Sequence, residues 1–152
     1  MRIAIGADHN GIVLKKTLKE FLTDQGHQVD DMGSQGVNPV DFPDIAVRVT
    51  EKIIDNVSAH GILICGTGVG MAMVANKVPT IRAALCHDIA SARQAREHND
   101  ANLLCLGGLI VGSGLAKEIV QTYLNAEFMG HRPGGERYAR RVEKMALLDR
   151  KR

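Results

Sequence analysis

The sequence predicts an α/β protein in which a five-stranded parallel sheet is covered by helices on both faces. Short apolar runs and segments of helical period alternate five times along the 152 residues, and the connections are long enough for the crossovers that parallel strands need. No internal repeat or interdomain linker interrupts this alternation. We therefore expect residues 1–152 to form a single domain, which is an ordinary size for one hydrophobic core.

The first half of the chain supplies three strands and two helices. Strands are expected at 2–7, 28–32 and 61–65, where short apolar runs end in glycine or polar loops. The helix after the first strand has apolar residues at roughly 3.6-residue spacing and ends at Gly26. Pro43 begins the second helix, because proline fits the first turn of a helix.

The second half continues the alternation. A helix is expected at 69–77, followed by a fourth strand at 81–86. Asp88 is a suitable N-cap for a helix that runs to about Glu97, after which residues 98–102 form a polar turn into the fifth strand at 103–106. Two further helices are expected, at 113–125 and from 136 onward, with a loop rich in glycine and proline between them.

Residues 61–70, with the sequence Gly-Ile-Leu-Ile-Cys-Gly-Thr-Gly-Val-Gly, are the first candidate for function. An apolar strand ends at Cys65, and three alternating glycines precede the next helix. Such a loop can turn several backbone N–H groups toward one anion, and the same groups favour the thiolate form of a cysteine at its mouth. For the loop alone, a structural turn after a core strand is the alternative. Cys86 and Cys105 lie inside strands and are expected to be structural.

Ligands of open parallel sheets bind at the carboxyl ends of the strands, near the point where the strand order reverses. This rule predicts that four polar groups share one edge of the sheet: Asp8-His9, the 65–70 loop, His87-Asp88 and His98-Asn99. Asp8 beside His9 suits either proton transfer or ligand binding. On the last helix, Arg137 and Arg141 stand four residues apart and share a face that fits a phosphate, although a salt-bridged helix surface has the same pattern.

Composition excludes several classes of protein. The net charge is only +2, and with no tryptophan, two tyrosines and three phenylalanines the chain has few aromatic platforms for nucleic acid. No apolar run approaches the roughly 20 residues that cross a membrane, and the amino terminus reads as a strand rather than a signal peptide, so a cytoplasmic protein is expected. Three cysteines without CxxC spacing favour neither a disulfide framework nor a zinc site. A small anionic ligand is the best expectation.

Together these residues resemble one known family, the type B ribose-5-phosphate isomerases and the related galactose-6-phosphate isomerase subunits. The resemblance covers nearly the whole chain and rests on segments 3–9, 41–43, 64–70, 75–77, 82–83, 97–102 and 137–142. It implies a three-layer Rossmann-like fold and metal-free aldose–ketose isomerisation of a phosphosugar, with no cofactor. It also implies a homodimer or homotetramer whose active sites are built across the subunit interface, with the C-terminal helix packed on a partner subunit.

The resemblance also implies a role for each matching residue. Cys65 matches the base that moves a proton between C1 and C2 through a cis-enediolate, and Thr67 matches the hydroxyl that passes a proton between O1 and O2. His98, assisted by Asp8, matches the group that opens the furanose ring, and Asn99 matches a contact to the reacting oxygens. The remaining matches bind anions: Gly66, Gly68, Val69 and Gly70 hold the enediolate through their amides, and His9, Arg137 and Arg141 hold the phosphate.

A few positions depart from the family pattern. Leu109 stands where many members carry a phosphate-binding arginine, and Phe42 stands where a tyrosine is common. The loop before the last helix is longer than expected, so Arg132 is a candidate for the missing cation. In a branch that lacks the cysteine, a glutamate just after the loop is the base, and Met71 at that position here favours Cys65. Ribose 5-phosphate remains the first choice of substrate, with allose 6-phosphate, galactose 6-phosphate or a tetrulose 4-phosphate behind it.

Two other classes of function stay open. A non-catalytic anion- or nucleotide-binding module would tolerate replacement of Cys65. Thiol chemistry at Cys65, either acyl transfer or redox, would need an activating partner such as His98. The chain offers no obvious resolving cysteine for the redox alternative.

Overall fold

The computed structural model describes residues 1–36 and 38–149 and contains, within these residues, one five-stranded sheet with all strands parallel. The strands are β1 (Arg2–Ala7), β2 (Gln28–Asp31), β3 (His60–Cys65), β4 (Ala83–Leu85) and β5 (Leu103–Gly107), arranged in the order β2-β1-β3-β5-β4. The helices are α1 (Ile12–Asp24), α2 (Phe42–Ile54), α3 (Val69–Ala75), α4 (Ile89–Asn99), α5 (Ser113–Asn125) and α6 (Glu136–Asp149), with a 3₁₀ turn at Met129–His131. The predicted parallel α/β fold is confirmed.

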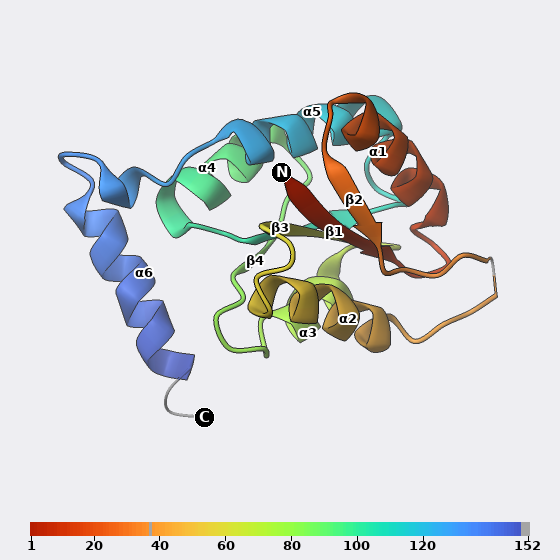
Figure 1. Cartoon of the computed structure of the whole chain (residues 1–152), viewed down its shortest axis with the longest axis horizontal. Helices are drawn as coiled ribbons and strands as arrows, with labels where there is room; N and C mark the ends of the chain where they lie inside the picture. Colours follow the sequence, from red (N-terminus) through yellow and green to blue (C-terminus); the bar gives the residue numbers. More distant parts are fainter. Residues whose placement is uncertain (37, 150–152) are drawn as a thin grey trace.

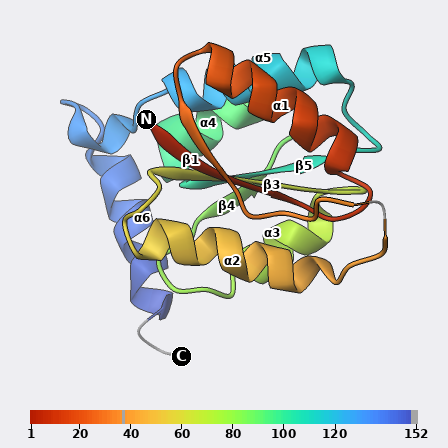
Figure 2. The ribbon, with the colours of Figure 1, turned by 45° about the vertical axis from the view of Figure 1, so that its right-hand side comes forward.

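Helices cover both faces of the sheet (Figures 1 and 2). α1, α4 and α5 pack on one face, and its core includes Ile3, Ile62 and Leu104. α2 and α3 pack on the other face, over Ala4 and Leu63. Neighbouring residues of a strand therefore enter opposite cores, as expected for a parallel sheet that is buried on both sides.

The strand order reverses between β1 and β3. From β1 the chain moves to β2 on one side, and it then crosses to β3 on the other side. In the sheet register Ala7 pairs with Ile64, and Cys65 pairs with Gly107. The carboxyl ends of β1, β3 and β5 thus lie side by side at the switch point, where α/β proteins of this kind bind ligands.

Three elements have a boundary two residues away from the predicted one. β4 is shorter because Ile81 closes a turn by donating to the Val78 carbonyl at 3.2 Å. α3 stops before residue 77 because the Asn76 side chain bonds both backbone groups of Ala83, each at 2.9 Å. α4 runs further than predicted, to Asn99, so the expected turn begins only after that residue.

α6 lies beside the α/β body rather than on the sheet (Figures 1 and 2). Among its described residues only Tyr138 is buried, whereas Met145, Leu147 and Leu148 are exposed apolar side chains. α6 therefore presents an apolar surface that the protomer leaves largely uncovered. No helix in the described part of the chain has the length and hydropathy to span a membrane.

Candidate functional site

The loop between β3 and α3 has a backbone that only glycine permits at its centre. Gly68, the N-cap of α3, is left-handed with φ at 78°. A Cβ atom at this position would lie 2.5 Å from Leu85 Cδ1 and 2.8 Å from the Leu106 carbonyl carbon. This conformation turns the Gly68 N–H toward the Cys65 sulfur, to which it donates at 3.1 Å. The Cys65 thiol is thus held by the loop that follows it.

Two further amides of the loop are available to a ligand. Within the described residues, the N–H groups of Gly66 and Thr67 donate to no protein acceptor. The loop is braced from β5, because Gly108 N–H donates to the Cys65 carbonyl at 2.7 Å and Leu109 N–H donates to the Gly66 carbonyl at 3.0 Å. A rigid loop with unpaired amides beside a thiol is suited to holding an oxyanion.

The three cysteines have different surroundings. Burial raises the pKa of the Cys86 thiol, and it raises that of the fully buried Cys105 well above its ordinary value. Neither sulfur is therefore suited to be a thiolate, which agrees with the structural role expected for both. Of the three thiols, Cys65 alone accepts the Gly68 amide and borders the loop.

Asp8 and His9 lie next to this loop, at the end of β1. Asp8 N–H donates to the Ile64 carbonyl at 3.1 Å, which places Asp8 beside the strand that ends in Cys65. Asp8 is only 5% exposed, and its carboxylate accepts the Asn10 N–H at 2.9 Å. The His9 ring receives the Val40 N–H at Nδ1 (3.4 Å), and its Nε2 lies 3.2 Å from Asn10 Nδ2. The Val40 N–H and the Asn10 side chain therefore fix the orientation of the His9 ring at this edge.

His87 is also at this edge, as predicted. Its Nε2 accepts the Gly107 N–H at 3.1 Å, and Gly107 is the register partner of Cys65. Asp88 caps α4, accepting the Ser91 N–H at 2.7 Å, so its predicted role as an N-cap is confirmed.

The prediction that His98 and Asn99 share this edge is wrong for a single protomer. Both lie in the last turn of α4, which runs antiparallel to the strands and so ends near the start of β5. β5 begins at Leu103, the register partner of Gly61 at the start of β3. Gly61 and Cys65 are four residues apart in β3, so the two edges are separated by about 13 Å of strand. The carboxyl-end rule does not apply to a residue at a helix end.

His98 instead lies with α6. Its ring stacks on Tyr138, with centroids 4.5 Å apart and planes 9° apart. The Arg137 guanidinium carbon lies 4.6 Å from the centre of the same Tyr138 ring, and this arginine also donates to the tyrosine hydroxyl. Arg141 follows one turn later on α6 and is exposed. The structure therefore forms a second group from His98, Asn99, Arg137 and Arg141.

Tyr138 was not predicted as a member of the site. The Tyr138 ring lies between His98 and Arg137 and contacts both. In the sequence, the one signal for this role was that Tyr138 directly follows Arg137 in a chain with only two tyrosines. Arg132, the candidate for a missing cation, forms an ion pair with Glu127 at 2.6 Å. Leu109 is 71% exposed and lies over the loop, since a Cβ at Gly66 would be 3.4 Å from Leu109 Cδ1.

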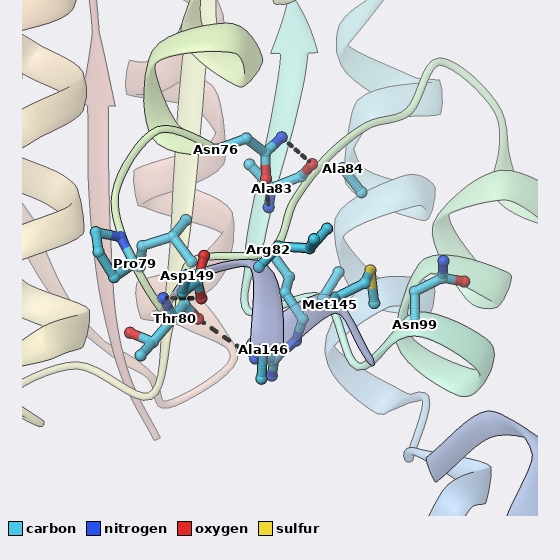
Figure 3. Close-up of a pocket in the computed structure, with 13 residues that line it drawn as sticks. Asn76, Pro79, Thr80, Arg82, Ala83, Ala84, Asn99, Met145, Ala146 and Asp149 are labelled. Atoms are coloured by element: carbon cyan, nitrogen blue, oxygen red, sulfur yellow. Dashed lines mark hydrogen bonds between the residues drawn. The ribbon is translucent and has the colours of Figure 1, made fainter. Parts of the chain in front are cut away.

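A pocket of about 720 Å³ lies between α6 and the segment before β4 (Figure 3). Asn99 lines it, as do Arg82 and Met145. Cys65 does not, because it ends β3 at the opposite edge of the sheet. Among the described residues, no group of three His, Cys, Asp or Glu side chains is placed to hold a metal ion.

Three comparisons relate the chain to known proteins. A sequence profile of the family described as Ribose/Galactose Isomerase matches residues 3–145. Ribose-5-phosphate isomerase B of Clostridium thermocellum superposes with a TM-score of 0.94 and 46% identity, covering 99% of each chain. D-erythrulose-4-phosphate isomerase of Pectobacterium atrosepticum is 45% identical over 151 residues, which is 98% of this chain and 95% of that protein. A putative sugar phosphate isomerase of Bacillus subtilis is 46% identical over 133 residues, 87% of this chain and 89% of the relative.

The fold and the loop define a parallel α/β protein that presents a thiol and free amides at a topological switch point. The match to the family profile covers most of the chain. The chain belongs to the ribose/galactose isomerase family and is a sugar-phosphate isomerase. The family resemblance inferred from sequence is confirmed.

Proposed function

We propose that this protein interconverts ribose 5-phosphate and ribulose 5-phosphate through a cis-enediolate, with Cys65 as the base. The observation that carries the proposal is the Gly68 N–H donated to the Cys65 sulfur at 3.1 Å, beside the free amides of Gly66 and Thr67. A base and a set of oxyanion donors at one loop are what proton transfer next to a carbonyl requires.

In this proposal the Cys65 thiolate removes the proton from C2 of the open-chain aldose, and the electron pair moves to O1. The amides of the 66–70 loop, of which those of Gly66 and Thr67 have no protein acceptor among the described residues, stabilise the resulting negative charge. A single oxyanion donor of this kind contributes roughly 3–4 kcal/mol. The Thr67 hydroxyl, which accepts the Val69 N–H at 3.4 Å, passes a proton between O2 and O1. Cys65 then returns its proton to C1, so that no other reactant is consumed.

The other half of the proposed site opens the furanose ring and holds the phosphate. His98 acts with Asp8 on the ring, Asn99 contacts the reacting oxygens, and His9, Arg137 and Arg141 bind the phosphate. Asp8 and His9 lie with Cys65 at the carboxyl ends of the strands and form the first group of site residues. The others belong to the second group, which lies near the opposite edge of the sheet. Since one small sugar must touch both groups, we infer that the second group comes from another copy of the chain, in a homodimer or homotetramer.

Exposed apolar side chains support this assembly. Several gather around the loop after β3 and on the neighbouring segments: Val69, Met73, Leu85, Leu109 and Ile110. The uncovered apolar residues of α6 form the second such surface. Exposed apolar side chains that gather in one place are typical of interaction sites. Packing of α6 on a partner would cover both surfaces and bring Arg137 to the loop.

The choice of sugar rests on the relatives and on Leu109. The C. thermocellum structure is named a ribose-5-phosphate isomerase B, whereas the P. atrosepticum relative is named for erythrulose 4-phosphate. Because this chain is 45% identical to the P. atrosepticum protein, a tetrulose 4-phosphate is the strongest alternative substrate, ahead of allose 6-phosphate and galactose 6-phosphate. Leu109 supplies no charge for a phosphate, and Arg132 is already paired with Glu127.

The test is deuterium incorporation at C2 of ribose 5-phosphate in D₂O, followed by NMR. Wild-type protein is expected to exchange C2 and to form ribulose 5-phosphate, and Cys65→Ala is expected to lower the rate by at least about a hundredfold, the usual contribution of a general base. Cys86→Ala is the matched control, because that thiol does not border the loop. Parallel reactions with erythrose 4-phosphate and allose 6-phosphate rank the sugars by kcat/KM.

Undiminished exchange in Cys65→Ala would contradict the assigned base. Absence of turnover with every phosphosugar, together with retained binding of phosphate, would instead favour a non-catalytic anion-binding module.

A further inference from the structure

Asp100 ends α4 in a left-handed conformation and is held by two arginines. Its φ is 48°, which is uncommon for a residue with a side chain. Its carboxylate accepts Arg96 Nη1 at 2.8 Å and Arg82 Nη2 at 2.7 Å. Arg82 Nε also donates to the Asp100 carbonyl at 2.7 Å, so Arg82 grips both the side chain and the backbone of this residue.

Ala101, the residue after Asp100, is also held by two hydrogen bonds. The Ala101 carbonyl accepts Arg96 Nη1 at 2.9 Å and the Tyr123 hydroxyl at 2.8 Å. Tyr123 lies fully buried in α5, and burial raises its pKa well above the ordinary value, so its hydroxyl keeps the proton that it donates. The turn that follows α4 is therefore fixed both to α5 and to the segment before β4.

The ionic cluster is partly shielded from water. The exposed fractions of the side chains are 26% for Arg82, 14% for Arg96 and 29% for Asp100. A network of shared, partly buried hydrogen bonds holds its geometry better than an isolated surface pair does. Arg82 and Asn99 line the same pocket, so the cluster lies next to the end of α4 that carries the second group of site residues (Figure 3).

His98 stands two residues before Asp100, in the turn that this cluster fixes. The His98 ring lies flat on Tyr138 of α6. This stack fixes the plane of the His98 ring, but the ring can still rotate or slide within that plane. Its position there depends on the backbone of α4. We propose that Asp100, clamped by Arg82 and Arg96, is a positioning residue that sets the orientation of His98 for ring opening. This inference rests on the proposed function, because it requires His98 to act on the sugar.

The physical reason is that proton transfer depends steeply on distance. A group displaced by about 1 Å from its productive position can lose up to about a hundredfold in rate. Replacing the Asp100 carboxylate by an amide would set an NH2 donor against one of the two arginines and remove the charge that both share, and the last turn of α4 would shift or fray. The expected defect is in kcat, since the phosphate contacts that govern substrate affinity are made by other side chains.

The test is a double-mutant cycle with ribose 5-phosphate. Asp100→Asn keeps the size of the side chain, tolerates the left-handed backbone and removes the charge. It is expected to lower kcat about tenfold, with KM unchanged within about twofold, while His98→Gln lowers kcat about a hundredfold or more. If Asp100 acts through His98, the double variant is no slower than His98→Gln alone, because sites that act as one unit are not additive.

Asp30→Asn is the matched control. Asp30 also accepts two hydrogen bonds from an arginine, Arg2, at 2.6 and 3.0 Å, but it lies on β2 away from both groups of site residues. Asp30→Asn alone should have the kcat of the wild type. Combined with His98→Gln, it should have the kcat of His98→Gln alone. If Asp100→Asn fails to fold, Arg82→Lys takes its place in the cycle. Lysine keeps the positive charge but cannot donate to the Asp100 carbonyl and carboxylate at the same time, as the arginine does.

The outcomes separate the two claims. An unchanged kcat in Asp100→Asn, or losses that multiply with those of His98→Gln, would overturn the positioning role and leave the isomerase proposal intact. Full activity of His98→Gln would remove the role of His98 and the inference with it. A wild-type protein that is inert toward all phosphosugars would overturn the proposed function itself.

Discussion

Gly68 joins the two chemical features of the proposed site, the thiol and the oxyanion loop. Its N–H contacts the Cys65 sulfur at 3.1 Å, while its left-handed backbone lets α3 begin at Val69. The same backbone lies against the Leu106 carbonyl and the Leu85 side chain. No other residue type fits without moving Cys65 or the strand beside it.

Gly68→Ala is therefore expected to damage both stability and activity. Left-handed backbone and overpacking against Leu106 together cost roughly 2–4 kcal/mol, and kcat should fall because the amide leaves the sulfur. Gly114→Ala is the control, since a Cβ there meets nothing within 4 Å and the change favours helix by up to about 1 kcal/mol. Urea unfolding of the two variants measures the difference. Equal stabilities would contradict the steric argument.

Leu109 is the residue at which substrate preference is best tested. It lies over Gly66 and is largely exposed in the protomer. If the site is merely short of a cation, Leu109→Arg should lower KM for ribose 5-phosphate by about three- to tenfold, as expected for one charge-assisted phosphate contact. Ile110→Arg, at the exposed neighbouring position, is the control. A higher KM in Leu109→Arg would indicate a pocket rebuilt for another ligand, and comparison with erythrose 4-phosphate would identify it.

At the scale of elements, alternation and turn chemistry were enough to predict most of the sheet and its helices. The β3–α3 loop was predicted for the same reason, because its glycines and cysteine are contiguous in sequence. The end of α4 was not, since its position depends on Arg82, a residue far away in the chain that holds Asp100. The mistaken placement of His98 followed from treating a helix end as a strand end.

His60, at the start of β3, should make the stability of this sheet depend on pH. Burial lowers the pKa of His60 to about 4, from about 6.5 when unfolded. Because the folded pKa is the lower one, the neutral form is favoured by folding, so stability is complete above pH 6.5 and is lost as pH falls toward 4. The total loss is about 2–3 kcal/mol, allowing for partial exposure. The free energy of unfolding at pH 5 and pH 7.5 measures it.

His60→Gln should flatten this dependence, even if it lowers stability at all pH values. His131→Gln, which removes an exposed imidazole near α6, is the control for the loss of a histidine elsewhere in the chain. An unchanged slope in His60→Gln would assign the pH dependence to another group.

At the scale of the whole molecule, the separation of Cys65 from His98 leads to a test of assembly. Each variant, Cys65→Ala or His98→Gln, should be nearly inactive alone. If a site takes Cys65 from one subunit and His98 from another, a mixed dimer contains one intact site and one site that carries both changes. Random mixing in equal amounts should then restore about a quarter of the wild-type activity, since half of the dimers are mixed and each has one of two sites intact.

The same experiment discriminates against a site within one protomer. In that arrangement every site of every mixed dimer would carry one of the two changes, and mixing would restore nothing. The subunits must first be exchanged, by dilution in mild urea and refolding together, and a mixture of Cys65→Ala with Cys65→Ala+His98→Gln is the control that should stay inactive. Recovery in the first mixture alone would explain why the protomer leaves both its loop and its last helix uncovered, because each would complete the other's site.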